Sequence, residues 1–153
     1  MNGIQCQQCV PNNHGITIQN CQCYANQNRS LDPGMVSNQF TTEYYKNTSN
    51  HGWNNTIHLF DTNCSVVCKN KHIGNEYDLL HLLMSENIKR ASYDKIKSGW
   101  AITGSDTMTI HVFGNIQFVA FNERNVRTLP FMELFVLKII GNSVKCVHHV
   151  FNF

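Results

Sequence analysis

Four cysteines near the N-terminus have the spacing in this sequence that most suggests chemistry. Cys6 and Cys9 form a C-x2-C pair, and Cys21 and Cys23 form a C-x-C pair. Structural zinc binds four thiolate or imidazole ligands in a tetrahedron, a geometry that suits a C-x2-C pair, and His14 could replace one thiolate. The C-x-C half is less typical of such sites, and the segment is rich in Gln and Asn. A disordered tail with free thiols is therefore favoured over a zinc clip, and no metal is assigned.

Titratable residues in the predicted strands are candidate acids and bases. These are Asp94, His111 and His148. A general base must face a pocket and needs a partner, and a lone strand histidine is more often a surface residue or a hydrogen-bonded core residue. The adjacent His148 and His149 point to opposite faces of a strand, which argues against a two-histidine metal site. The sequence shows no convincing Asp–His pair, so we predict no catalytic residue, no cofactor and no enzyme.

Length and charge restrict the class of protein. The 153 residues suit one domain, with 42% hydrophobic and 14% charged residues and a formal net charge of +2. This charge is too small to predict nucleic-acid binding. No apolar run approaches the roughly 20 residues that a membrane-spanning helix needs. The first ten residues lack the basic flank and apolar core of a secretory signal. We therefore expect a cytoplasmic protein with reduced cysteines and no membrane contact.

The pattern of the chain changes near residue 32. Residues 1–31 have no sustained periodicity and are expected to form a tail, whereas residues 32–153 are patterned and form the predicted domain. Asp32 and Pro33 are typical of a helix start, and the helix should end in the turn-rich segment 46–52. Residues 54–60 predict a short second helix. Residues 64–68 predict a strand or the start of a hairpin, with two cysteines as packing residues.

A third helix is predicted over residues 76–87, with a buried stripe of Tyr77, Leu80, Leu83 and Met84. After residue 88 the apolar period becomes two, which predicts four strands separated by turns. The strands are expected at 88–102, 107–122, 131–140 and 144–153, the turns at 104–106, 123–128 and 141–142, and a bulge or bend at Gly114.

This order of elements predicts an α+β fold: a curved antiparallel sheet with three helices packed on one face, forming a cone with a pocket. Three short helices cannot cover both faces of so amphipathic a set of strands. We therefore predict a homodimer.

Several segments, in this order and at these spacings, resemble a known family. They are Phe40–Tyr45, Leu59–Phe60, His81–Asn87, Val112–Ile116, Phe131–Leu137 and His148–Phe151. Together they resemble nuclear transport factor 2-like domains over residues 35–153. They are most similar to the N-terminal domain of the stress-granule scaffolds that bind Ras-GTPase-activating protein.

The resemblance implies a homodimer formed through the curved sheets and a hydrophobic groove for Phe-Gly-type peptides between the first helix and the last strands. Matched position by position, the groove residues would be Val36, Phe40 and Glu43 on the helix, with Leu59, Phe131 and Val144 as walls. Two of these walls, Leu59 and Val144, stand where the scaffolds have phenylalanine. The implied function is a non-enzymatic adaptor, cytoplasmic or shuttling to the nuclear envelope.

Three alternatives remain open at this point. The groove residues could simply fill the core, since apolar side chains mostly do. The chain could be a nucleocytoplasmic transport accessory that binds the Phe-Gly repeats of nucleoporins. It could also be an isomerase or dehydratase that uses the cone pocket. A polar pair inside the cavity would favour the enzyme, and an open apolar groove would favour the adaptor.

Overall fold

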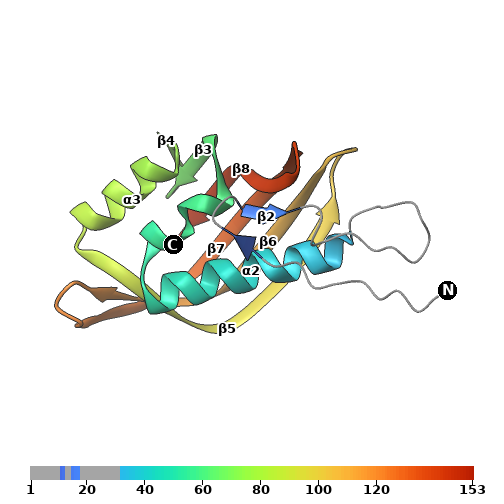
Figure 1. Ribbon diagram of the computed structural model, residues 1–153. Helices are drawn as coiled ribbons and strands as arrows, with labels where there is room; N and C mark the ends of the chain where they lie inside the picture. The colour runs from blue at the N-terminus through green and yellow to red at the C-terminus, as the bar shows by residue number, and fades with distance from the viewer. Residues whose placement is uncertain (1–10, 13–14, 18–31) are drawn as a thin grey trace.

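The computed structural model describes residues 11–12, 15–17 and 32–153. Two α-helices and a 3-10 helix lie on one side of a curved sheet whose long strands cross behind them (Figure 1). The sheet order is β1-β2-β8-β7-β6-β5, and the hairpin of β3 and β4 joins it through β8. The predicted α+β cone is therefore confirmed. One pair differs from the expected antiparallel pattern, because β3 runs parallel to β8.

The helices begin where the sequence predicts. The Asp32 carboxylate accepts hydrogen bonds from the main-chain N–H groups of Gly34 and Met35, so helix α2 (Pro33–Asn50) starts at once. The 3-10 helix η1 (Trp53–Leu59) follows. Helix α3 (Glu76–Ser85) begins with a capping box, in which Asn75 and Asp78 each accept from the other's main-chain N–H.

The buried stripe of α3 differs from the prediction. Tyr77 and Met84 are each 51% exposed, whereas Glu76, Leu79 and Leu83 are buried. The helix is therefore rotated so that a carboxylate enters the core while an aromatic ring faces solvent. The reason is a partner for Glu76 deep in the sheet, which apolar periodicity cannot reveal.

The six principal strands are β3 (Phe60–Cys68), β4 (Lys71–Gly74), β5 (Ile88–Ile102), β6 (Thr107–Ala120), β7 (Asn125–Ile140) and β8 (Ser143–Asn152). The predicted turn at 123–128 is shorter than expected, and β7 already begins at Asn125. Glu123 adopts a left-handed φ of 60°, and the N–H of Ala120 bonds to the carbonyl of Arg124. This tight turn leaves the following residues free to pair.

Gly114 lies opposite a bulge, as its place inside a long strand suggested. The bulge is in the neighbouring strand β5, where Lys95 has a φ of 54° and the register with β6 shifts between Asp94 and Lys97. A Cβ at Gly114 would lie 3.0 Å from the carbonyl oxygen of Asp94 and 3.2 Å from the Cα of Ile96. Glycine is thus needed here because the two backbones approach closely.

The segment predicted as an unpatterned tail contains two short strands. Strand β1 (Pro11–Asn12) pairs with β2 (Gly15–Thr17), and β2 pairs antiparallel with the start of β8, with Ile16 opposite Val144. The four N-terminal cysteines lie outside the described residues. Residues 11–12 and 15–17 of the predicted tail are therefore strands, and the rest of residues 1–31 lies outside the described residues.

The two faces of the long strands have different environments. One face packs against the helices and forms the hydrophobic core. On the other face, cross-strand partners place Phe113 beside Met132, His111 beside Leu134, and Leu134 beside Val150. We call the side chains of His111, Phe113, Met132, Leu134, Val136 and Val150 the open face, because the described helices lie on the opposite side. In the described part of the chain, no helix is long and apolar enough to cross a membrane.

Candidate functional site

A carboxylate and an imidazole lie inside the core. On β7 the side chains of Phe131, Glu133, Phe135 and Leu137 point inward in alternation, so Glu133 occupies a core position and is fully buried. On β8 the buried residues are Val144 and Cys146, then His149 and Phe151. The register of β7 with β8 shifts between these two pairs. This bulge changes the alternation of β8 and turns His149 into the core.

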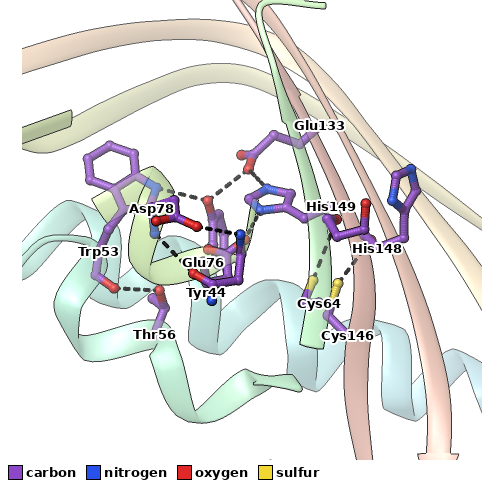
Figure 2. Close-up of polar contacts among 12 residues, drawn as sticks. Tyr44, Trp53, Thr56, Cys64, Glu76, Asp78, Glu133, Cys146, His148 and His149 are labelled. Atoms are coloured by element: carbon purple, nitrogen blue, oxygen red, sulfur yellow. Dashed lines mark hydrogen bonds and ion pairs between the residues drawn. The ribbon is translucent and has the colours of Figure 1, made fainter. Parts of the chain in front are cut away.

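His149 connects two carboxylates. Its Nδ1 lies 2.5 Å from Oε1 of Glu76, and its Nε2 lies 2.7 Å from Oε2 of Glu133. The Glu133 carboxylate also accepts hydrogen bonds from the hydroxyls of Tyr44, at 2.7 Å, and Tyr45, at 2.9 Å. The indole N–H of Trp53 in turn donates to the Tyr44 hydroxyl. We call this chain of contacts the Glu-His-Glu network, and Figure 2 shows the part of it formed by Trp53, Tyr44, Glu133, His149 and Glu76.

The network changes the protonation of its members. Burial by itself lowers the pKa of His149, but the charge of Glu76 and the hydrogen bonds to both carboxylates outweigh it and raise the pKa to about 10. His149 is therefore a buried imidazolium at neutral pH. Burial, followed by the charge of Glu133, raises the pKa values of Tyr44 and Tyr45 well above 10. Both hydroxyls stay protonated and act as donors.

Aromatic rings surround this cation. The Phe135 ring stacks on the His149 imidazole with centroids 4.7 Å apart and an angle of 15°, and Phe151 lies on a nearly parallel plane at 6.2 Å. The Tyr44 ring meets the imidazole edge-on at 5.9 Å. A cation over aromatic faces is attracted by their quadrupoles, which adds to its pairing with the two carboxylates.

The network borders a surface cavity at Glu76. Glu76 is almost fully buried, yet it lines a hollow of about 270 Å³ between η1, β3 and the start of α3. His58, Asp61 and Lys145 line the same hollow. Nε2 of His58 lies 3.5 Å from a Glu43 oxygen. Burial lowers the pKa of His58, although the Glu43 carboxylate acts in the opposite sense.

The strand residues predicted as candidate bases do not meet at this site. Asp94 and His111 are exposed, and His148 is half-buried on the face of β8 opposite His149. The expectation that only one of the two adjacent histidines could face inward is confirmed, and the inward one is His149. The expectation from the sequence concerned only Asp–His pairs, of which none was found; the acids that pair with His149 in the structure are two glutamates.

The six predicted groove residues lie almost entirely in the core. Phe40 and Leu59 are 0% exposed, and Val36, Phe131 and Val144 are at most 4% exposed. Only Glu43, beside His58, is partly exposed. None of the six lines the cavity beside Glu76, nor a second hollow of about 190 Å³ beside Tyr45. Their burial favours core packing, and a role in peptide binding stays a prediction.

The cysteines of the domain have a packing role. Cys64, Cys68 and Cys146 are buried and form no disulfide bond. A packing role for Cys64 and Cys68 was predicted from the sequence. Burial raises the pKa of Cys68 to about 11 and that of Cys146 well above its usual value. A thiolate is thus disfavoured at both positions. Among the described residues, no group of histidine, cysteine and acidic side chains is arranged to hold a metal ion.

Sequence reasoning missed Glu133, His149 and Glu76, although one signal was present. Glu133 stands at an inward position between Phe131 and Phe135, and a charged residue at such a position requires a buried partner. His149 and Glu76 carried no comparable signal. A bulge decides the orientation of His149, and the rotation of α3 decides that of Glu76.

Comparison of the fold with solved structures identifies its type, whereas neither a protein-family profile nor a curated protein matches the sequence. Nuclear transport factor 2 from Cryptosporidium parvum is 15% identical, with a TM-score of 0.65 over 80% of this chain and 97% of that protein.

Two further structures extend the comparison. A nuclear transport factor 2-like superfamily protein from Salmonella enterica is 11% identical, with a TM-score of 0.62 over 78% of this chain and 92% of its own. A ketosteroid isomerase-like protein from Erwinia carotovora atroseptica is 12% identical, with a TM-score of 0.59 over 75% of this chain and 91% of its own. At these identities the likeness concerns the fold alone: the chain has the cone fold of nuclear transport factor 2-like proteins.

Proposed function

We propose that this chain is a non-enzymatic protein-binding adaptor domain that works as a homodimer through its open face. The observation that carries the proposal is the contrast between a closed interior and an apolar exterior. His149 and Glu133 are 0% exposed. Phe113, by contrast, is 51% exposed on the sheet face that the described helices leave uncovered.

The open face has the composition of a protein contact surface. Phe113 lies beside Met132, and His111 beside Leu134, with their side chains on the same side of the sheet. The Phe113 and His111 rings are 5.7 Å apart. A contiguous apolar surface that is rimmed by polar residues, here Lys97 and Lys138, is typical of an interface. A second copy of the same face is the partner that the resemblance implies.

Analytical ultracentrifugation tests the dimer. We expect wild-type protein at micromolar concentration to sediment at twice the chain mass of 17.5 kDa. Leu134→Glu should give monomers, because it places two like charges opposite each other across a symmetric contact. Met84→Glu, at an exposed position of α3 on the helix side, is the matched control and should stay dimeric. A monomeric wild type, or a dimeric Leu134→Glu protein, would contradict the proposal.

The recruited partners, in this proposal, are proteins with Phe-Gly-type motifs. The support is the resemblance, which places a groove at Val36, Phe40, Leu59 and Val144; these residues lie together in the apolar cluster of the core, so a peptide would have to open it. Isothermal calorimetry with a synthetic Phe-Gly peptide, against the same peptide with Phe replaced by Ala, tests it. Equal heats for the two peptides would reject this partner class, whether it comes from scaffold ligands or from nucleoporin repeats.

A second candidate function is an isomerase or dehydratase that uses the cavity beside Glu76. It is favoured by one observation: a carboxylate bonded to the buried imidazolium of His149 lines a hollow of about 270 Å³. A carboxylate in such a place can remove a proton from a bound carbon acid. Turnover of a carbonyl compound panel that is lost in Glu76→Gln and kept in Asp61→Asn would support this candidate over the adaptor.

A further inference from the structure

Strand β2, from the N-terminal part of the chain, pairs with the first residues of β8. Strand β3 pairs with β8 from Cys146 onward. It therefore does not pair with Ser143 and Val144, which come before Cys146 on the same edge of β8. Strand β2 fills this gap, with Ile16 opposite Val144 and Thr17 opposite Ser143. The backbone groups of a sheet edge are a template for any extended segment.

The place of β2 coincides with the predicted peptide groove. Strand β2 contacts β8, α2 and η1, and these three elements carry Val144, Val36, Phe40 and Leu59. The groove implied by the resemblance runs between the first helix and the last strands. The chain's own strand therefore lies where a partner's peptide would be expected.

We propose that β2 is an internal occupant of a strand-addition site on β8, which a partner's extended peptide takes by displacing it. The proposal rests on the proposed protein-binding function and names its site. The partner segment is extended and uncharged and resembles Gly15-Ile16-Thr17, a small residue followed by β-branched ones. Main-chain hydrogen bonds would supply affinity, as in other strand-addition complexes.

The geometry of β2 suits a displaceable occupant. Among the described residues, it pairs with β8 through two residue pairs, whereas β7 pairs with the other edge of β8 over most of its length. In the sequence, 14 residues (18–31) separate β2 from the helix start at Asp32. A tethered segment competes with a free peptide at an effective concentration set by its linker, which lowers the apparent affinity of the partner.

The experiment uses the full chain and a synthetic peptide of residues 11–17. In the double variant Ile16→Pro/Thr17→Pro, β2 cannot form, because proline removes the main-chain donors that a ladder needs. The control variant Ile16→Val/Thr17→Val keeps a strand-forming sequence. Binding is measured by NMR titration, with the amide signals of Ser143 and Val144 as the local readout. A scrambled peptide serves as the second control.

We expect the peptide to bind the proline variant about tenfold or more tightly than the wild type, with shifts centred on Ser143 and Val144. The valine variant should behave like the wild type. Equal affinity for all three chains, no binding to the proline variant, or shifts elsewhere would overturn the proposal. Loss of the cooperative melt in the proline variant would overturn it too, since β2 would then be structural. Sedimentation is a separate readout, so failure of the dimer and failure of the strand site can be told apart.

Discussion

Each face of β7 departs from the usual distribution of residues. Its inward side carries the buried Glu133 among apolar side chains, and its outward side carries Leu134 and Met132 on the open face. The inner charges are tolerated because each polar group of Glu133 and His149 has a partner. Among the described residues, no helix covers the outer apolar side chains. The contrast shows that pairing decides what the interior accepts, and the proposed dimer would be what covers the open face.

Of the substitutions considered, His149→Leu, on the inner face, should lower the free energy of unfolding most. It leaves two buried carboxylates without their shared cation, and removing one partner of a buried ion pair costs about 3–5 kcal/mol. We expect a loss of about 5 kcal/mol, at the upper end, because His149 pairs with both Glu76 and Glu133. Urea unfolding measures it. His148→Leu on the opposite face is the control and should change stability by less than about 1 kcal/mol.

Phe40→Ala tests whether the predicted groove residues belong to the core. Phe40 is fully buried and packs edge-on against Phe60 and Phe135. Its truncation should cost about 3–5 kcal/mol of unfolding free energy. Chemical denaturation and peptide calorimetry are measured on the same protein. An unchanged denaturation midpoint with weakened Phe-Gly peptide binding would instead place Phe40 in an open groove.

The pH dependence of stability should report the buried imidazolium. The folded-state pKa of His149 is raised to about 10 from an ordinary value of 6.5. The stabilisation is therefore complete below pH 6.5 and is lost as the pH rises toward 10. Linkage gives a decrease of about 2–3 kcal/mol between pH 7 and pH 9. Urea titrations at both pH values measure it, and His149→Gln should lack this decrease.

Phe113→Ser should affect association while leaving the fold almost unchanged. A large apolar side chain in the middle of an interface is typical of a binding hot spot, so the dimer dissociation constant should rise about tenfold or more. The unfolding free energy of the monomer should change by less than about 0.5 kcal/mol, because Phe113 is half exposed. Phe121→Ser is the control: Phe121 is equally exposed but lies beyond the end of β6. If both substitutions changed sedimentation to a similar extent, the open face would not be the specific dimer contact.

The sequence predicted the elements well, because local signals determine them. Asp32 and Pro33 mark the start of α2, and the period-two pattern gives β5 with both ends correct. The site was not predictable in the same way. The inward orientation of His149 depends on a bulge in β8, because alternation counted from Val144 would place His148 inside instead. The burial of Glu76 depends on a partner far away in sequence.

The stack of Phe135, His149 and Phe151 has a spectroscopic consequence. The imidazole of His149 lies nearly parallel to the Phe135 ring, with centroids 4.7 Å apart. Protons held above the face of an aromatic ring are shielded by its ring current. At a pH low enough to protonate all the histidines, the carbon-bound protons of His149 should therefore resonate upfield of those of the others. Their signals would give a direct view of the interior, present only while the core is packed.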